Sequence, residues 1–450
     1  MKITLPKRFL VTSHTKRVKP GSIFVAIHGH KEDGSRYIPD ALKRGAKGIV
    51  ISQEMSLSQE YKNLIKQHGA TITSVKNTRK ELAILSAKQS NYAHKKLKII
   101  GITGTKGKTS TAFILEHILR ISGYKTALIS SIYNKILDQS FESDLTTDQP
   151  DYLHVFFKAC LEHSVEFVVM EVAAQAISLH RVETIEFDAV IFTNFSHEHG
   201  EFYENMEQYF LEKTKIFTQL KKGGRAFINA DDNWCKKIIK KNPDFLSFFL
   251  GNEIYNLEHP SLVGTFNKYN IAAAISVAQH IGISPKDAQS HIKTLKKIPG
   301  RLELHRLKNK TRVFIDYAHN PSSFVAVLST LRQMTNHLIV VFGAGGERDH
   351  TKRPAMGKIA TQIADVVIIT SDNPRSEDPL EIIEDICAGI EEKNRHKVMR
   401  EPDRKKAIKI ACQKATPSSI IALLGKGPDE YQIIGNRKIR FSEKEIIQKM

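Results

Sequence analysis

The segment that most constrains this chain is a glycine-rich stretch at residues 101–110, which reads Gly-Ile-Thr-Gly-Thr-Lys-Gly-Lys-Thr-Ser. Residues 97–103 have the apolar run of a buried strand, and apolar side chains recur at helical spacing in residues 112–119. Glycines between a strand and a helix let backbone N–H groups face phosphate oxygens, and the helix N-terminus adds partial positive charge. The stretch therefore predicts a phosphate-binding loop in an α/β domain.

The residue types in this loop assign a role to each of its polar side chains. Lys108 is expected to bridge the β and γ phosphates of a nucleotide, and Thr109 to hold magnesium. The spacing is tighter than the common Gly-x-x-x-x-Gly-Lys-Thr pattern, because position 102 is Ile. A glycine-rich stretch is often only a turn, but the flanking strand and helix favour the phosphate loop. The expected ATP contacts here are Gly104, Thr105, Lys106, Gly107, Lys108 and Thr109.

Strand-length and helix-length patterns alternate along all 450 residues and predict three α/β domains with mainly parallel or mixed sheets. We expect the domains to cover residues 1–92, 93–298 and 299–450. The last boundary follows from a break at residues 298–301, beyond which the pattern restarts. Four apolar runs then predict strands at residues 313–315, 338–342, 366–369 and 419–424.

Two acidic or imidazole side chains follow strands of the central domain and could hold metal. Glu171 ends the apolar run 167–172, where a phosphate-loop site needs a carboxylate for magnesium. His199 follows the run that ends at Asn194. Taken singly, a strand-end glutamate is often solvated and a lone histidine is often structural. Together with the loop, they make Thr109, Glu171 and His199 the expected metal ligands.

Polar loops follow the four predicted strands of the last domain, and ligands of open α/β sheets bind at such strand ends. The loops begin at Asp316, Gly343, Asp372 and Gly425. The second and third carry Arg348 and Arg375, whose guanidinium groups can hold carboxylates through two hydrogen bonds. A phosphate loop and a carboxylate-binding site together indicate ATP-driven activation of a carboxylate. Hydrolase or kinase chemistry would also use the loop, but neither needs a second domain with paired arginines.

Composition limits the partners that this chain can have. It carries 67 Lys and Arg against 48 Asp and Glu, a net charge of +19, which favours anionic ligands. The basic residues are spread along the chain with few interleaved aromatics, so we expect no nucleic acid partner. No apolar stretch approaches the roughly 18 residues that span a bilayer, so we expect no membrane association. The four cysteines form no Cys-x-x-Cys pair, which favours cytoplasmic thiols over a disulfide framework or a zinc site.

Taken in order, these residues resemble the Mur ligase family, and within it the type that adds the third amino acid of the cell-wall peptide. Residues 18–26 and 29–34 look like the family's uridine-nucleotide domain, residues 104–109 like its ATP loop, and residues 209–213 like the segment with its carbamylated lysine. Residues 264–270 and 299–301 are similar to its adenine and phosphate contacts. Residues 372–375, Asp-Asn-Pro-Arg, are similar to the motif of meso-diaminopimelate enzymes.

The resemblance implies a set of site residues and a reaction. The catalytic residues would be Lys108, Glu171, His199 and Lys213, the last as N6-carboxylysine. Further ATP contacts would be Asn267, Asn270, Arg301 and Asp316. The UDP-substrate would meet Thr15, His30, Lys31, Glu32, Thr146, Thr147, Ala173 and Arg181. The incoming amino acid would meet Arg348, Asp372, Asn373, Pro374, Arg375, Gly425 and Asp429.

On this reading the chain is a monomeric cytoplasmic ligase that uses ATP and Mg²⁺. It joins UDP-MurNAc-L-Ala-D-Glu to an amine through an acyl phosphate, and the expected amine is meso-diaminopimelate. Its N-terminal domain binds the UDP-substrate, its central domain binds ATP, and its Rossmann-like last domain binds the amino acid and ATP.

Departures from the family pattern leave two alternatives open. Family members usually have Glu-Val-Ser-Ser-His where residues 171–175 read Glu-Val-Ala-Ala-Gln, and Gly-Lys-Gly-His-Glu where residues 425–429 read Gly-Lys-Gly-Pro-Asp. Leu179 replaces a common glutamine, the usual Asp-His pair is Glu-His at 198–199, and residues 14–16 replace Asp-Ser-Arg. The chain could therefore use another amine or acceptor, or could be a catalytically weak nucleotide-binding paralogue.

Overall fold

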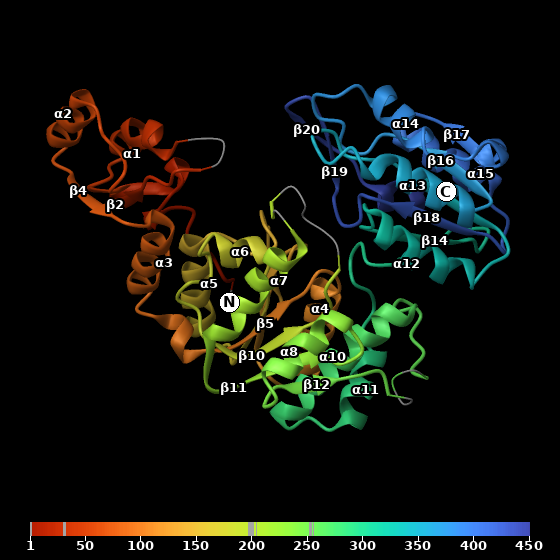
Figure 1. Cartoon of the computed structure of the whole chain (residues 1–450), viewed down its shortest axis with the longest axis horizontal. Helices are drawn as coiled ribbons and strands as arrows, with labels where there is room; N and C mark the ends of the chain where they lie inside the picture. The colour runs from red at the N-terminus through yellow and green to blue at the C-terminus, as the bar shows by residue number, and fades with distance from the viewer. Residues whose placement is uncertain (1, 30–32, 197–201, 204, 252–253, 255) are drawn as a thin grey trace. The chain divides into compact units, whose positions relative to one another are not determined.

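The computed structural model describes residues 2–29, 33–196, 202–203, 205–251, 254 and 256–450. The chain divides into two compact units, the first of residues 1–249 and 270–292 and the second of residues 250–269 and 293–450. Both units are α/β structures, and Figure 1 colours the chain by residue number from red at the N-terminus to blue at the C-terminus. Among the described residues, none of the helices has the length and apolar character required to cross a bilayer.

The first unit begins with a four-stranded parallel sheet in the order β1-β2-β3-β4. Its strands are β1 (Phe9–Thr12), β2 (Val18–Val25), β3 (Gly48–Ser52) and β4 (Thr71–Val75). Its helices are α1 (Ile38–Lys43), α2 (Gln59–Gln67) and α3 (Thr78–Gln89). The helix α3 leads toward the next sheet through a short 3₁₀ turn at Ala93–Lys96.

The second sheet of this unit has eight strands in the order β12-β11-β10-β5-β9-β6-β7-β8, of which β6, β7 and β8 pair antiparallel. These strands are β5 (Lys98–Thr103), β6 (Thr126–Ile129), β7 (Asn134–Ile136), β8 (Gln139–Phe141), β9 (Phe167–Glu171), β10 (Phe187–Phe192), β11 (Leu220–Asn229) and β12 (Leu246–Phe248). Its helices are α4 (Lys108–Ile121), α5 (Pro150–Glu162), α6 (Ala174–Ser178), α7 (Met206–Thr214), α8 (Asn233–Lys241), α10 (Thr265–Ile281) and α11 (Pro285–Lys293).

Three adjacent strands of this sheet, β10, β5 and β9, bring the predicted polar residues of the central domain to one edge. Parallel pairing aligns Thr103 at the end of β5 with Phe192 of β10, and Ile102 with Glu171 of β9. All three strands are buried on both faces, which explains their continuous apolar runs. The phosphate loop therefore leaves the sheet between two strand ends that carry polar side chains.

The second unit has a six-stranded sheet in the order β13-β14-β18-β15-β16-β17, in which only β13 is antiparallel. The strands are β13 (Glu303–Arg306), β14 (Arg312–Asp316), β15 (Leu338–Phe342), β16 (Val366–Ile369), β17 (Val398–Arg400) and β18 (Ile420–Leu424). The helices are α12 (Pro321–Arg332), α13 (Lys352–Ile363), α14 (Pro379–Cys387), α15 (Arg404–Lys414) and α16 (Glu443–Gln448). The four predicted strands are neighbours, so their polar loops share one edge.

Two edge strands and a hairpin of this unit escape the sequence pattern. The hairpin pairs β19 (Tyr431–Ile434) with β20 (Arg437–Arg440), and all four residues of β20 are exposed. A strand that reads Arg-Lys-Ile-Arg has no apolar alternation to reveal it. β13 and β17 also lack a clear strand pattern. Each is short and partly polar because it lies at an edge of the sheet.

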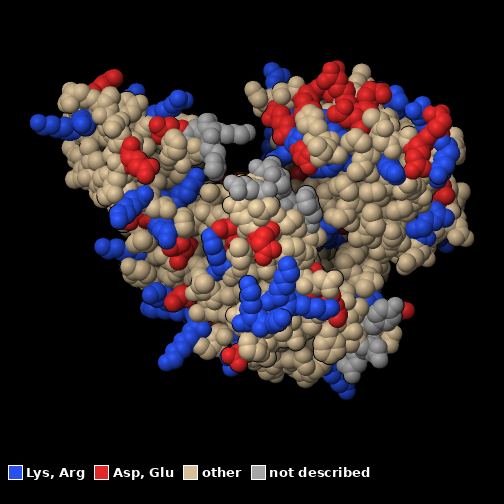
Figure 2. All heavy atoms as spheres, in the orientation of Figure 1, with Lys and Arg blue, Asp and Glu red and all other residues tan. Residues whose placement is uncertain are grey.

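Basic side chains are spread widely over the surface that Figure 2 shows. Figure 2 shows lysine and arginine spread over the visible face with acidic residues between them, and a dense basic group over α8. In that helix Lys236, Lys237, Lys240 and Lys241 are all exposed. The buried side of the helix carries Cys235 and Ile238. Because this apolar face packs inward, the lysines face solvent.

Two buried histidines lie beside the 3₁₀ turn that follows α3. His94 and His154 are each 1% exposed, and their rings meet edge to face with centroids 4.9 Å apart. His154 Nε2 lies 2.9 Å from Thr184 Oγ1, and neither ring nitrogen of His94 has a hydrogen-bond partner among the described residues. Burial lowers the pKa of His94 to about 4 and that of His154 to about 3. Both rings are therefore neutral in the folded protein at neutral pH.

We expect this pair to make the first unit sensitive to acid. An unfolded histidine binds a proton below about pH 6.5, whereas the folded pair resists protonation, so stability falls as the pH drops from 6.5 toward 4. At pH 5 the loss for His94 alone is about 2 kcal/mol. The variant His94→Leu should lose less melting temperature between pH 7 and pH 5 than the wild type. The exposed His396→Gln is the control, and equal pH dependence in all three proteins would contradict the prediction.

Candidate active site

The phosphate loop has a backbone that only glycine can follow at two positions. Gly104 has φ +135° and Gly107 has φ +83°, in the region that L side chains rarely adopt. A Cβ on Gly104 would lie 2.0 Å from Thr193 Oγ1, and one on Gly107 would lie 2.3 Å from Asn270 Oδ1. The loop is therefore packed against the end of β10 on one side and against α10 on the other.

The residues after β10 hold this loop through hydrogen bonds. Thr193 Oγ1 donates to Lys106 O at 2.6 Å, and Asn194 Oδ1 accepts from Lys106 N at 3.0 Å. Thr105 N donates to Asn194 O at 2.9 Å. The Thr-Asn pair at residues 193–194 thus fixes the loop backbone, which leaves the Lys108 side chain to lie over the loop.

Lys108 and Lys213 converge on one oxygen atom. Lys108 Nζ donates to Gly104 O and to Thr105 O, each at 3.0 Å. Lys213, from α7, is 1% exposed and donates to the same Gly104 O at 2.8 Å. Its ammonium also lies 4.8 Å from the ring centroid of Tyr209. The two predicted catalytic lysines are therefore neighbours at the phosphate loop.

A group of oxygen atoms surrounds Thr109 at the start of α4. Thr109 Oγ1 donates to Glu171 Oε2 at 3.0 Å and lies 3.1 Å from Ser131 Oγ. Ser131 N donates to Glu171 Oε1 at 2.9 Å, and Glu171 is 1% exposed. A carboxylate and two hydroxyls are hard oxygen donors of the kind that magnesium prefers. Within the described part of the chain, no three His, Cys, Asp or Glu side chains form a cluster for metal.

Ser131 is the member of this group that sequence reasoning missed. It follows β6, which pairs with β9, and so it reaches Glu171 from the neighbouring strand end. A serine after a short apolar run is too common to single out from sequence. The predicted ligand His199 lies outside the described residues, as do His30, Lys31 and Glu32 of the predicted UDP-substrate contacts.

Three of the predicted UDP-substrate residues meet at the end of β9. Thr147 Oγ1 donates to Glu171 O at 2.9 Å and accepts from Ala173 N at 3.0 Å. Arg181 Nη1 donates to Thr147 O at 3.0 Å, and burial lowers the pKa of Arg181. Thr146 precedes this contact and is half-buried. The group therefore adjoins the Thr109–Glu171 oxygens through Glu171 itself.

Thr15 belongs to a short 3₁₀ turn, Thr15–Arg17, between β1 and β2. Arg17 in the same turn lies 3.6 Å from Asp144 and 3.6 Å from Asp151. Asp151 also accepts a 2.7 Å hydrogen bond from Thr12. These contacts tie the first sheet to residues 144–151, the segment that contains Thr146 and Thr147. Next to them, burial raises the pKa of Asp148 to about 6.

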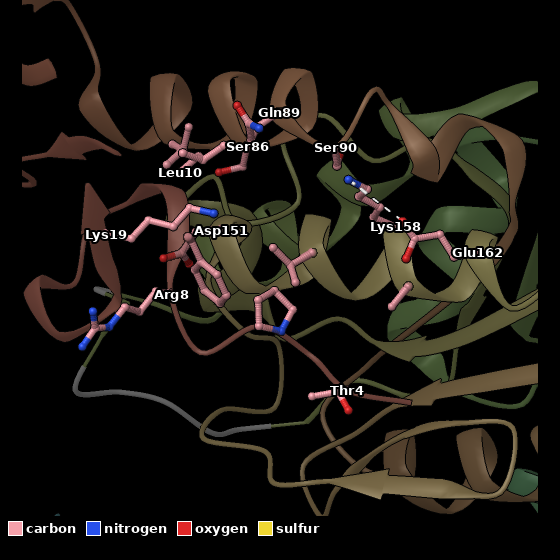
Figure 3. Close-up of a pocket in the computed structure, with 15 residues that line it drawn as sticks. Thr4, Arg8, Leu10, Lys19, Ser86, Gln89, Ser90, Asp151, Lys158 and Glu162 are labelled. Atoms are coloured by element: carbon pink, nitrogen blue, oxygen red, sulfur yellow. Dashed lines mark ion pairs between the residues drawn. The ribbon is translucent and has the colours of Figure 1, made fainter. Parts of the chain in front are cut away.

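A cavity of about 230 Å³ also opens between residues 4–11, α3 and α5. Figure 3 shows Ser86, Gln89 and Ser90 on one wall and Asp151, Lys158 and Glu162 on another. Lys158 and Glu162 form a 4.0 Å ion pair across successive turns of α5. None of the predicted site residues lines this cavity, although Asp151, which pairs with Arg17, does.

The predicted nucleotide contacts on α10 divide between the two units. Asn270, in the first unit, is 5% exposed and accepts from Thr111 Oγ1 at 3.3 Å beside the phosphate loop. Asn267, in the second unit, donates to Val263 O at 2.9 Å.

In the second unit the two remaining predicted ATP contacts, Arg301 and Asp316, lie at the end of β14. Asp316 accepts from Leu302 N at 2.7 Å and from Ala318 N at 2.8 Å. Burial raises the pKa of Asp316, and the nearby Arg301 opposes that shift. The Arg301 guanidinium lies 4.9 Å from the ring centroid of Tyr317.

Arg348 and Arg375 both lie close to Gly345. A Cβ on Gly345 would be 3.1 Å from Arg375 Nη1 and 3.5 Å from Arg348 Cγ. Arg375 has φ +54°, a left-handed backbone that costs a non-glycine residue about 1–2 kcal/mol. The β19–β20 hairpin holds this conformation, because Arg375 N donates to Ile433 O at 3.1 Å and its carbonyl accepts from Gly435 N at 2.7 Å.

The side chains of the predicted residues Asp372 and Asn373 contact other residues of the second unit. Asn373 Oδ1 accepts from Lys426 Nζ at 2.8 Å and from Ile433 N at 2.9 Å. Asp372 Oδ1 lies 3.7 Å from Lys426 Nζ, and a Cβ on Gly425 would be 2.5 Å from Asp372 Oδ2. Lys426 is fully buried and was not among the predicted site residues. The loops after β16 and β18 are therefore joined by a buried ion pair.

Asp429, the residue that replaces the family's glutamate, lies near the same group. Burial raises the pKa of Asp429, and Lys426 opposes that shift. Burial also raises the pKa of the neighbouring Tyr431 to about 12. Pro374, which precedes Arg375, is buried. The predicted amino-acid contacts thus gather at the ends of β15, β16 and β18.

Comparison with known families places similarity along nearly the whole chain. Residues 10–90 match the Mur ligase family catalytic domain, residues 102–260 the Mur ligase middle domain, and residues 300–427 the Mur ligase glutamate ligase domain. Among curated relatives, the UDP-N-acetylmuramoyl-L-alanyl-D-glutamate–2,6-diaminopimelate ligase of Fusobacterium nucleatum is 35% identical, over 97% of this chain and 92% of that protein. The proteins of that name from Clostridium perfringens and Aquifex aeolicus are each 37% identical, over 96% and 98% of this chain and 92% and 93% of theirs.

Solved structures agree with this similarity. A structure of a UDP-N-acetylmuramoyl-L-alanyl-D-glutamate–2,6-diaminopimelate ligase is 25% identical and superposes with a TM-score of 0.63, covering 98% of this chain and 94% of that one. The MurF ligase of Thermotoga maritima in complex with ADP is 18% identical with a TM-score of 0.61, over 94% of this chain and 95% of its own, and shares the fold.

Proposed function

This chain belongs to the Mur ligase family, and from that premise we propose that it is an ATP-dependent ligase that joins meso-2,6-diaminopimelate to UDP-N-acetylmuramoyl-L-alanyl-D-glutamate. The observation that carries the proposal is similarity over 97% of the chain to the Fusobacterium nucleatum ligase of that name. The phosphate loop and the pair of arginines beside Gly345 support it.

In the first step the γ-phosphoryl group of ATP passes to the D-glutamate carboxylate, which gives ADP and an acyl phosphate. Lys108 and the backbone N–H groups of residues 104–107 stabilise the negative charge of the transferring group. The fixed backbone of this loop means that these donors need no rearrangement during the transfer.

Magnesium fits the donor set at the start of α4. Thr109, Ser131 and Glu171 would hold it, together with His199 from the sequence pattern. When bound, the metal neutralises charge on the β and γ phosphate oxygens. The Thr109 hydroxyl and the Glu171 carboxylate already face each other at 3.0 Å, so they need little movement to share one cation.

In the second step the amine of the incoming amino acid attacks the acyl carbon, and inorganic phosphate leaves as the amide forms. Arg375 and Arg348 would bind the carboxylate at the far end of meso-diaminopimelate, and Asp429 would bind its ammonium there. The assignment rests on the common position of these residues at the ends of β15, β16 and β18.

We further assign the UDP-substrate to residues 1–92 and to the Thr147–Arg181 contacts, ATP to residues 93–298, and the amino acid to residues 299–450. Asn267, Asn270, Arg301 and Asp316 complete the ATP contacts in this assignment. The enzyme would work as a cytoplasmic monomer. The basic surface suits its substrates, since both the UDP-substrate and ATP are polyanions.

The experiment that tests this function is ADP release with UDP-MurNAc-L-Ala-D-Glu, ATP and magnesium, screened against a panel of amino acids. Turnover that requires meso-diaminopimelate supports the proposal. ADP release that no amine stimulates would contradict the ligase reaction itself.

A second candidate keeps the chemistry but changes the amine. Asp429 is one methylene shorter than the family's glutamate, and Pro428 replaces its histidine. A shorter carboxylate reaches less far toward an ammonium group, so a different amine could fill the site better. Faster turnover with another amino acid in the same panel would favour this candidate.

We propose that Lys213 is carbamylated. The neutral amine adds to carbon dioxide and loses a proton, which replaces a buried cation by a carboxylate. Because Lys108 and Lys213 now share Gly104 O, this change would turn a contact between like charges into an ion pair and supply oxygen for magnesium.

The variant Lys213→Ala should lose activity by about 10²-fold, the cost of disturbing a metal's ligand shell. Added formate or acetate should restore part of the rate by supplying the missing oxygens. Lys215→Ala is the matched control, because Lys215 is exposed and pairs with Glu212. A Lys213→Ala enzyme with the wild-type rate would show that this lysine is an ordinary buried cation.

A further inference from the structure

The loops that carry Arg348 and Arg375 are joined along their length. Gly346 N donates to Asn373 O at 2.9 Å, and Ser376 Oγ donates to Glu347 Oε1 at 2.6 Å. Arg375 Nη1 also donates to Gly346 O. The two guanidinium groups therefore sit on one connected piece of backbone, and a shift in either loop changes their separation.

Arg353 lies beneath this piece, at the start of α13, and none of the proposed steps uses it. Its side chain is 1% exposed. Nη2 donates to Gly345 O at 3.2 Å and to Glu377 Oε2 at 2.8 Å, and Nη1 donates to Asp385 Oδ2 at 2.8 Å. One guanidinium thus connects the loop after β15, the loop after β16 and the helix α14.

The charges around Arg353 mean that its removal should shift the loops that it connects. Glu377 and Asp385 both face this cation, and His350 Nδ1 lies 3.0 Å from Nη1. Without the guanidinium the two carboxylates would repel each other, and the carbonyl of Gly345 would lose its donor. Arg375 Nη1 and Arg348 Cγ both lie within 3.5 Å of the place that a Cβ on Gly345 would take, so movement of Gly345 affects both side chains directly.

We infer that Arg353 is a positioning residue that sets the distance between Arg348 and Arg375, and through it the preference for an amino acid with a carboxylate at its far end. This inference rests on the proposed function. A planar guanidinium serves three acceptors in fixed directions, which a lysine ammonium on a flexible stem cannot reproduce. Arg353 touches the backbone and the acids behind the site, not the substrate.

The test compares Arg353→Met with the wild type in steady-state kinetics. We expect the KM for meso-diaminopimelate to rise by about 10-fold or more, while the KM for ATP and the kcat at saturating amino acid change by less than about 3-fold. The selectivity for meso-diaminopimelate over L-lysine should fall by about 10-fold. Arg353→Lys should give intermediate values, because it restores the charge without the fork.

Arg332→Met is the matched control. It also removes an arginine–carboxylate pair, with Asp365, but at the opposite end of β15 and β16, where Asp365 accepts from Leu338 N. If Arg353→Met does not fold, Glu377→Ala replaces it. That side chain is 20% exposed, and its loss frees the same loop from the same cation. The KM for meso-diaminopimelate should then rise in the same direction by a smaller factor.

Unchanged KM and selectivity in folded Arg353→Met, or in Glu377→Ala, would overturn the inference. The inference would also fail if the KM for all three substrates rose equally in Arg353→Met and in Arg332→Met, because that pattern marks general destabilisation. If the wild type uses another amine, the choice of meso-diaminopimelate fails, and the KM for that amine still tests Arg353. A wild type with no amine-dependent turnover contradicts the proposed function, and this inference with it.

Discussion

Lys108→Ala should abolish useful turnover, with a fall in ADP formation of about 10²–10³-fold or more. The Lys108 ammonium donates to the backbone carbonyls of both Gly104 and Thr105, at the point where the loop curls. Removal of one donor to developing charge in a transition state costs about 2.7–4 kcal/mol. Alanine is a good helix former, so the substitution at the first position of α4 should leave the fold intact.

The control for this variant is Lys125→Ala, an exposed lysine in the turn after the same helix. It removes the same charge from the same domain without touching the loop, so its rate should match the wild type. Both variants should melt within a few degrees of the wild type. ADP formation by Lys108→Ala above about a tenth of the wild-type rate would mean that the loop does not hold the reacting phosphate.

The sequence was most informative where local backbone chemistry demands particular residues. At Gly104 and Gly107 a positive φ and a neighbour within 2.3 Å exclude any side chain, so the glycines mark the loop in any context. The four polar loops of the second unit were predictable for a similar reason. Each follows a continuous apolar run, and such runs form adjacent parallel strands whose ends share an edge.

Residues whose partners are brought close only by tertiary structure were not predictable in this way. Ser131 reaches Glu171 only because β6 pairs with β9, and Lys426 reaches Asp372 only because β18 lies close to β16 across β15. Arg353 is a charged residue among charged neighbours in sequence, yet it is almost fully buried. The signal for such residues is their burial with a partner, which appears only when strands distant in sequence meet.

The same distinction applies to Asp372 and Asn373. The Asp-Asn-Pro-Arg motif predicts all four residues at the amino acid, with Arg375 binding its carboxylate. In the structure the Asp and Asn side chains hold Lys426 and the hairpin, and Arg375 is the member of the motif beside Gly345. Asp372 and Asn373 therefore stabilise the loop that carries Arg375. This division of labour makes Arg375 the residue whose side chain should decide the choice of amino acid.

We expect the wild type to prefer meso-diaminopimelate over L-lysine by about 10²–10³-fold in kcat/KM. The two amino acids differ at the far end, where meso-diaminopimelate has a carboxylate that L-lysine lacks. The Arg375 guanidinium can bind that carboxylate through two hydrogen bonds, whereas L-lysine would bring its ammonium without the carboxylate and leave the arginine unpaired. An uncompensated buried charge costs about 3–5 kcal/mol, and each 1.4 kcal/mol is a factor of ten. Because Arg375 is only half-buried, the lower part of this range is the firmer expectation.

Arg375→Ala should remove that preference while leaving the reaction itself possible. Arginine and alanine both carry a Cβ, so the cost of φ +54° is the same in both, and the comparison reports the lost guanidinium. Arg437→Ala, in the exposed strand β20, is the control that removes an arginine from the same unit. The measurement is kcat/KM for both amino acids on all three enzymes. Both amino acids carry an ammonium at the far end, so the shorter Asp429 should raise the KM of meso-diaminopimelate and of L-lysine alike without changing their ratio. Equal or better use of L-lysine by the wild type would refute the choice of amino acid and leave the ligase reaction with a different amine.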